Sequence, residues 1–133
     1  MPFADLPGVR LFYTDDGAGS PLLLVHGWGA DSHQWSWHLA ALAQRHRVIA
    51  PDLRGHGRSS APPDGYSPRA LAADLAALLE RLDAGPVVAV GHSMGAFVVS
   101  VLKTRADLLG PGTAGTLNLG GLDAQVSRAL TTR

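Results

Sequence analysis

The sequence has no cysteine, which excludes disulfides, thiolate metal sites and a cysteine nucleophile. It has no charge excess either. With 11 acidic and 11 basic residues the net charge is +0, so nothing favours nucleic acid or an anionic membrane as a partner. The start has no basic segment and no long apolar run, which predicts no signal peptide, no membrane span and a cytoplasmic location. The 133 residues are 46% hydrophobic and 17% charged, which predicts a single globular domain.

Short apolar segments alternate with helical patterns along most of the chain. The predicted strands are residues 9–14, 21–26, 47–50 and 86–90, and the predicted helices begin near residues 31, 67 and 96. The middle helix has Ser67 as its N-cap and Pro68 as its first residue, and its leucines share one face, as in a helix that lies on a sheet. This alternation predicts an α/β protein with a doubly wound, mostly parallel sheet.

A Gly-His-Ser-Met-Gly motif at residues 91–95 follows an apolar strand and opens a helix. A serine on such a tight turn needs strained backbone to hold its hydroxyl clear of the sheet. Glycine is needed two residues to either side, because side chains there would collide with neighbouring backbone. The helix that follows directs its N-terminal N–H groups toward the serine, where they suit a developing oxyanion. Ser93 is therefore the candidate nucleophile, and the alternative is an incidental turn.

A second glycine turn, His-Gly-Trp-Gly, occupies residues 26–29 at the end of a predicted strand. Glycine there lets a backbone N–H approach a ligand. The N–H of Trp28 is thus a candidate oxyanion donor beside that of Met94. The alternative is a helix entry in which Trp28 merely packs. A third loop, residues 52–59, is interpreted as structural, with Asp52 and Arg54 pairing to fix it.

These three segments, in this order and spacing, resemble the α/β-hydrolase superfamily over about residues 8–102. They look most like its esterase, lactonase and cofactor-free haloperoxidase members. The resemblance implies a hydrolase of ester-type bonds, with Ser93 as nucleophile and the backbone N–H groups of Trp28 and Met94 as the oxyanion hole. It implies a small ester-like substrate and neither cofactor nor metal. Serine at this position argues against the aspartate-nucleophile branches, the epoxide hydrolases and haloalkane dehalogenases.

The sequence departs from the family after the nucleophile, where the family places its catalytic acid and then its histidine. Asp107 and Asp123 follow Ser93, but no histidine does. We therefore expect a partial α/β-hydrolase fold that ends soon after the nucleophile turn, in one truncated domain. Its family-like core is residues 1–103 and its divergent tail is residues 104–133. Such a chain is expected to be inactive alone.

Three earlier histidines are candidates to replace the missing base. His26 and His56 lie in loops that could approach the site. His92 adjoins Ser93, although neighbouring side chains on a strand end point apart. Packing or surface roles are the favoured interpretation for all three.

Two other interpretations stay open. A non-catalytic fragment or partner-binding remnant fits the missing histidine. A dinucleotide-binding domain fits Gly27 and Gly29 after a strand, with Asp52 at the end of the next. Against it, Ser32 replaces the third glycine of that fingerprint and Trp28 fills the turn.

The tail determines what covers the predicted strand at residues 86–90. It has only weak signals: a strand around Leu117 and Leu119, and a helix around Leu122, Val126 and Leu130. Without a following strand, residues 87–90 form an open apolar edge, and self-association through this edge is expected.

Overall fold

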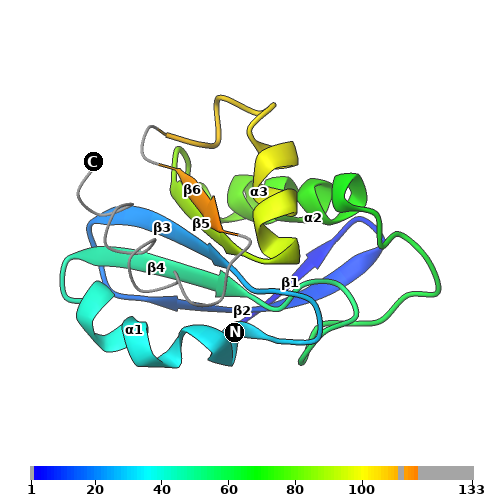
Figure 1. Ribbon diagram of the computed structural model, residues 1–133, viewed down its shortest axis with the longest axis horizontal. Helices are drawn as coiled ribbons and strands as arrows, with labels where there is room; N and C mark the ends of the chain where they lie inside the picture. The colour runs from blue at the N-terminus through cyan, green and yellow to red at the C-terminus, as the bar shows by residue number, and fades with distance from the viewer. Residues whose placement is uncertain (1, 111–112, 117–133) are drawn as a thin grey trace.

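The computed structural model describes residues 2–110 and 113–116. Within them lies a six-stranded sheet in the order β1-β2-β4-β3-β5-β6 (Figure 1). The strands are β1 (Phe3–Leu6), β2 (Val9–Asp16), β3 (Ser20–Val25), β4 (His46–Pro51), β5 (Val88–His92) and β6 (Ala114–Thr116). β1, β2 and β4 pair antiparallel, whereas β4, β3, β5 and β6 run parallel. The predicted mostly parallel α/β sheet is therefore confirmed, with β1 as an addition that the sequence did not predict.

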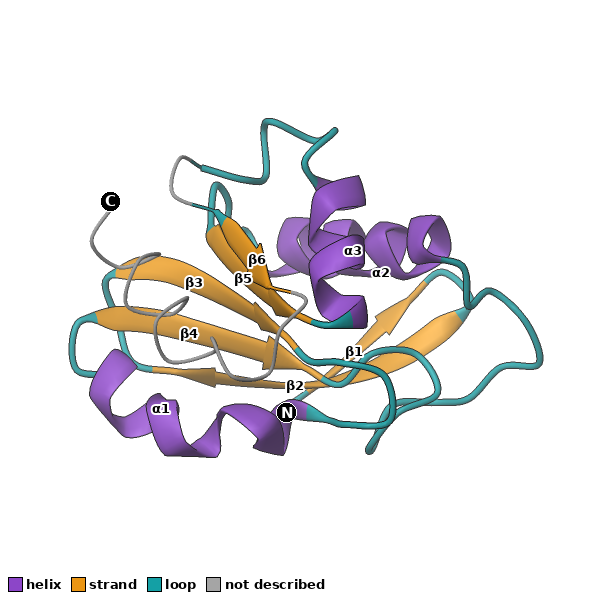
Figure 2. Ribbon diagram, viewed as in Figure 1, coloured by secondary structure: helices purple, strands orange, loops and turns teal. Residues whose placement is uncertain are grey.

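Helices cover both faces of the sheet (Figure 2). A short 3₁₀ helix (Ser32–Trp35) and α1 (Ser36–Leu42) lie on one face, and α2 (Pro68–Leu82) and α3 (Met94–Leu102) lie on the other. α2 begins as predicted, because the Ser67 hydroxyl caps it by accepting a hydrogen bond from the N–H of Ala70 at 3.1 Å. α1 ends at Leu42.

The side chains of β3 divide the interior into two cores. Leu23 and Val25 pack in the core beneath α2 and α3, whereas Leu22 and Leu24 pack with Trp35 on the α1 side. Successive side chains of a strand point to opposite faces, so burial of both faces requires a continuous apolar run. This is the physical reason for the run that the sequence shows in β3.

The expectation of an open edge along β5 is wrong. The N–H of Val87 donates to the carbonyl of Leu108 at 2.8 Å, and the N–H of Gly110 donates back to Val87 at 2.7 Å. β6 then continues the pairing along residues 90–92. Its Ala-Gly-Thr sequence has no apolar pattern, and we attribute its pairing to the backbone groups that β5 would otherwise leave unpaired. Self-association on this side of the sheet stays a prediction, and it would involve β6 rather than β5.

Other expectations about the tail have different outcomes. The strand predicted around Leu117 and Leu119 and the helix predicted around residues 122–130 lie outside the described residues. Leu108, in the predicted tail, is buried in the core beneath α2 and α3. In the part of the chain that the structure describes, no helix is long and apolar enough to cross a membrane.

The connections around β3 create a crevice at one end of the sheet. α1 joins β3 to β4 across one face, and α2 joins β4 to β5 across the other, so β4 and β5 lie on opposite sides of β3. Ligands of open α/β sheets bind at the carboxyl ends of strands whose connections diverge in this way. The register aligns Val25 with Gly91, so the turns that follow β3 and β5 meet at this point.

Candidate active site

Ser93 lies in the turn between β5 and α3, with its backbone in an unusual conformation. Its φ of 57° and ψ of −120° are rare and strained for a residue with a side chain. It lines a cavity of about 450 Å³ together with residues that include Gly27, Trp28, Gln34 and His92. No described residue makes a hydrogen bond with the Ser93 hydroxyl. This hydroxyl is thus placed to meet a ligand in the cavity.

Backbone crowding explains both glycines of the turn. A Cβ added to Gly91 would overlap the carbonyl oxygen of Gly95. A Cβ added to Gly95 would overlap the carbonyl oxygens of Val25 and His26, the latter at 2.6 Å. The sequence argument that side chains at these two positions collide with backbone is therefore confirmed.

We expect Gly95→Ala to lower the free energy of unfolding by about 3 kcal/mol, because the added methyl group overlaps the carbonyls at the end of β3. Gly110→Ala is the matched control, since its Cβ would meet its nearest neighbour at 3.7 Å, an ordinary contact. Urea unfolding followed by circular dichroism measures both variants. Equal stability of the two would contradict this account of the turn.

The His26 imidazole fixes the turn after β3. It is fully buried, its Nδ1 lies 2.7 Å from the carbonyl oxygen of Gly27, and its Nε2 lies 2.9 Å from the N–H of Leu53. A backbone N–H can only donate, so Nε2 accepts and the ring proton is on Nδ1. The N–H of Ala30 also donates to the Gly27 carbonyl, at 3.1 Å. Because C=O and N–H of a trans peptide point in opposite directions, these two bonds fix the direction of the Trp28 N–H.

Two backbone N–H groups at this site have no acceptor among residues 2–110 and 113–116. The Trp28 N–H has no acceptor among the described residues. Met94 is the first residue of α3, where N–H groups have no partner inside the helix. No acidic side chain occupies the first turn of α3 to compete for them. The structure thus brings the turn that holds Trp28 and the turn that holds Ser93 and Met94 to one cavity.

His92 and His56, the other two candidate bases, also have hydrogen-bond partners. His92 Nδ1 lies 2.6 Å from Nε2 of Gln34, and its own Nε2 is buried with no partner among the described residues. His56 Nδ1 lies 3.0 Å from the carbonyl oxygen of Arg54. The His56 ring also contacts the rings of His26 and Trp28, each with centroids 5.0 Å apart. None of these histidines bonds to the Ser93 hydroxyl.

Burial lowers the pKa of His26 below its ordinary value of 6.5 and lowers the pKa of His92 in the same way. The unfolded chain therefore binds more protons than the folded chain below about pH 6.5. The stability that these two neutral histidines contribute is fully present above this pH, and it is lost as the pH falls through their lowered pKa values. We expect a smaller free energy of unfolding at about pH 5 than at about pH 7.5.

Urea unfolding at the two pH values measures this loss. His33→Gln is the control, because the His33 side chain is 78% exposed and the variant should lose as much stability as the wild type. Stability that is equal at both pH values, or higher at the lower one, would contradict the assignment of buried neutral histidines.

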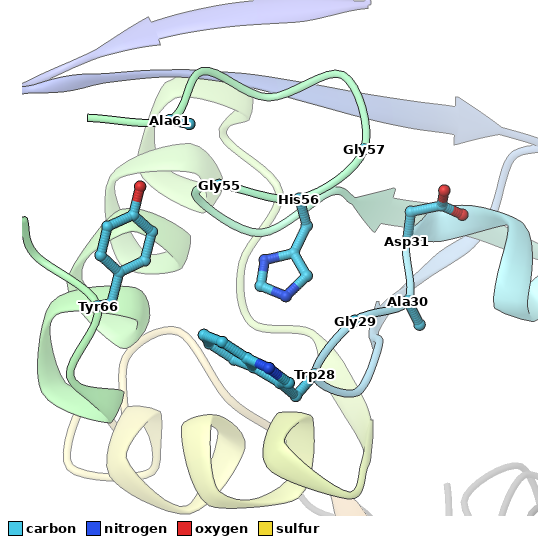
Figure 3. Close-up of a pocket in the computed structure, with 9 residues that line it drawn as sticks. All are labelled: Trp28, Gly29, Ala30, Asp31, Gly55, His56, Gly57, Ala61 and Tyr66. Carbon is cyan, nitrogen blue, oxygen red and sulfur yellow. The ribbon is translucent and has the colours of Figure 1, made fainter. Parts of the chain in front are cut away.

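Trp28 is not packed away. Its side chain is 67% exposed, and residues 28–30 line a second cavity, of about 530 Å³, as well as the first. In Figure 3 the indole lies against the His56 ring, with Tyr66 across from both. The structure therefore argues against a merely packed Trp28 and places a large apolar ring at the mouth of the site.

The predicted pair between Asp52 and Arg54 does not form. Asp52 accepts hydrogen bonds from the N–H groups of Ser32 at 2.7 Å and Arg58 at 2.9 Å. Arg54 instead makes two bonds of 2.9 Å to Asp74 on α2. The interpretation of the loop as structural holds, but most of these partners come from segments distant in sequence. The occupied Asp52 carboxylate also argues against the dinucleotide-binding interpretation, which needs it for a ribose.

Residues 20–105 match the family model of the alpha/beta hydrolase fold. This chain belongs to the α/β-hydrolase family. Over 97 residues it is 45% identical to a non-heme haloperoxidase of Rhodococcus erythropolis, covering 71% of this chain and 35% of that protein. Over 95 residues it is 40% identical to a soluble epoxide hydrolase of Corynebacterium sp. (strain C12), covering 71% of this chain and 33% of that protein.

Solved structures agree with this membership. A thermophilic esterase from Thermogutta terrifontis matches with a TM-score of 0.74 and 38% identity, covering 82% of this chain and 41% of that one. This α/β-hydrolase chain spans about a third of the length of the curated relatives it matches. Because the names of these relatives include a haloperoxidase, an epoxide hydrolase and an esterase, the reaction has to be argued from the site.

Gln34 is the residue of this α/β-hydrolase site that the sequence did not predict. It lies outside all three motifs, and no local pattern marks a glutamine whose amide binds two other turns. No group of three histidine, aspartate or glutamate residues within residues 2–110 and 113–116 is placed to hold a metal ion.

Proposed function

We propose that this chain provides the nucleophile and the oxyanion hole of a serine hydrolase that acts on ester-type bonds. One observation supports the proposal above all. The strained Ser93 turn places a hydroxyl without a described partner in the same cavity as the Gly27–Trp28 turn. Strain of this kind persists where the surrounding structure enforces it, and it concentrates at functional sites.

The proposed chemistry begins with attack of the Ser93 oxygen on the carbonyl carbon of an ester. The carbonyl oxygen gains the electron pair of the broken π bond and becomes an oxyanion. The N–H groups of Trp28 and Met94 donate to this oxyanion, and the N-terminus of α3 adds its positive partial charge. Collapse of the intermediate expels the alcohol and leaves an acyl group on Ser93, which water then removes.

These steps need a base that takes the serine proton and passes it to the leaving alcohol. His26 does not suit this role, because its Nε2 accepts from Leu53 and its Nδ1 donates to Gly27. His92 does not suit it either, because its Nδ1 accepts from Gln34. His56 lines the cavity of about 530 Å³ and not the one that Ser93 lines, and its Nδ1 lies 3.0 Å from the carbonyl oxygen of Arg54. No histidine follows residue 92 in the sequence. We therefore propose that these 133 residues do not turn over substrate by themselves.

The side chain at position 93 supports ester chemistry over epoxide hydrolysis, which is named among the relatives. The resemblance implies an aspartate nucleophile for epoxide hydrolases, whereas this chain has a serine hydroxyl, which suits acyl transfer. The cavity of about 450 Å³ has the exposed indole of Trp28 beside it, which suits a small substrate with an apolar part. A cytoplasmic location stays a prediction.

Phosphonylation of Ser93 by a fluorophosphonate probe tests the nucleophile directly.

The second candidate function is a non-catalytic, partner-binding fragment. It is favoured by one observation, that no described histidine makes a hydrogen bond with the Ser93 hydroxyl. Labelling of Ser93 by the probe distinguishes the two, because a partner-binding fragment needs no reactive serine.

A further inference from the structure

The Gln34 side chain bonds to both turns of the site. It extends from the 3₁₀ helix (Ser32–Trp35) on the α1 side of the sheet. Its Oε1 accepts a hydrogen bond from the N–H of Gly27 at 3.0 Å, and its Nε2 lies 2.6 Å from Nδ1 of His92. One amide group thus connects the turn after β3 to the end of β5.

The chemistry of the donors fixes the orientation of this bridge. The Gly27 N–H can only donate, so the amide atom that faces it is the oxygen of Gln34. The remaining NH₂ group can only donate, so Nδ1 of His92 accepts and the ring proton of the neutral imidazole is on Nε2. Burial favours this neutral form. The bridge therefore specifies one tautomer of His92.

We propose that Gln34 is a positioning residue that fixes the Gly27–Trp28 turn against the Ser93 turn by bridging the Gly27 N–H to His92. The importance of this bridge for reactivity rests on the proposed function. Gly27 directly precedes Trp28, and His92 directly precedes Ser93. The bridge thus sets the separation between the two peptide segments that supply the two oxyanion donors.

A fixed separation matters because the two donors act on one oxygen atom. Donors of an oxyanion hole stabilise the transition state only when both lie at hydrogen-bond distance from the place where the charge develops. The Gly27 carbonyl is already held by His26 and Ala30, which orients the Trp28 N–H within its own turn. Among the bonds described for Gly27, the hydrogen bond from its N–H to Gln34 connects the turn, through His92, to the neighbouring strand β5.

Nitrogen-15 NMR of the His92 ring, with Ser93 labelling by a fluorophosphonate, tests the bridge in the full 133-residue chain. In the wild type we expect the His92 proton on Nε2. In Gln34→Glu the carboxylate still accepts from Gly27 but cannot donate, so we expect His92 to gain a proton on Nδ1. A residue that only fills space would not move this signal.

Gln34→Leu removes both bonds, and we expect Ser93 to label roughly 10- to 100-fold more slowly than in the wild type. Gln44→Leu is the matched control, since Gln44 is exposed and should change neither the ring signal nor the labelling rate. A wild-type His92 proton on Nδ1, or an unchanged labelling rate in a folded Gln34→Leu chain, would overturn the proposal. If the probe does not label wild-type Ser93, the nucleophile assignment fails. The His92 tautomers in the wild type and in Gln34→Glu then decide by themselves whether the bridge exists.

Discussion

Ser93 is expected to be the serine that a fluorophosphonate modifies first, and Ser93→Ala is expected to abolish that label. The reaction forms a bond between the serine oxygen and phosphorus, and it releases fluoride and the hydroxyl proton. The phosphoryl oxygen then occupies the place of the oxyanion, where the Trp28 and Met94 N–H groups donate to it. The serine with these donors beside it should therefore react far faster than a serine on an open surface.

Peptide mapping by mass spectrometry after short exposure to the probe measures this preference. Ser100→Ala is the matched control, because Ser100 lies on the same helix and is exposed, with its hydroxyl donating to the carbonyl of Phe97 at 2.7 Å. This variant should keep the full label at Ser93. Label spread evenly over other serines, with Ser93 unmodified, would show that the nucleophile is wrongly assigned.

The second large effect concerns turnover. A polypeptide of these 133 residues is expected to hydrolyse p-nitrophenyl acetate only at a trace rate. A neutral serine hydroxyl is a weak nucleophile without an adjacent base, and the same base is needed to protonate the leaving group and activate water. Oxyanion donors and binding alone leave an acceleration of about 10³–10⁴ over water when a triad is removed. The chain should also show no bell-shaped dependence of rate on pH.

Steady-state rates of the wild type and Ser93→Ala decide this prediction. Robust turnover that Ser93→Ala abolishes would mean that a base exists within these residues. The variants His26→Ala, His56→Ala and His92→Ala would then identify it, if one of them also lost activity. Trace activity that is the same with and without Ser93 would agree with a catalytically silent polypeptide.

Several features of this protein followed from adjacent residues alone. The alternation of apolar runs and helical patterns predicted the α/β class. A strand buried on both faces of a sheet needs a continuous apolar run, whereas a helix buried on one side needs an apolar stripe at helical spacing. The Ser67 cap and Gly91 were equally readable, since each depends on backbone within four residues. Gly95 was found by its place in the motif, although the carbonyls that a side chain there would meet belong to Val25 and His26, far away in sequence. The candidate nucleophile belongs to this class of local feature.

Other features depended on segments that only the tertiary structure brings together. Arg54 binds Asp74, His26 binds Leu53, and Gln34 binds His92, which lies 58 positions further along the sequence. β6 pairs with β5 although its three residues have no strand pattern, as expected when unpaired backbone groups accept almost any sequence that reaches them. A local pattern records burial and backbone shape, whereas the choice of a hydrogen-bond partner depends on which groups the folded chain leaves within about 3 Å of one another. The sequence therefore determined the fold class and the candidate nucleophile, and the tertiary structure determined how the oxyanion turn is held and which histidines are already engaged.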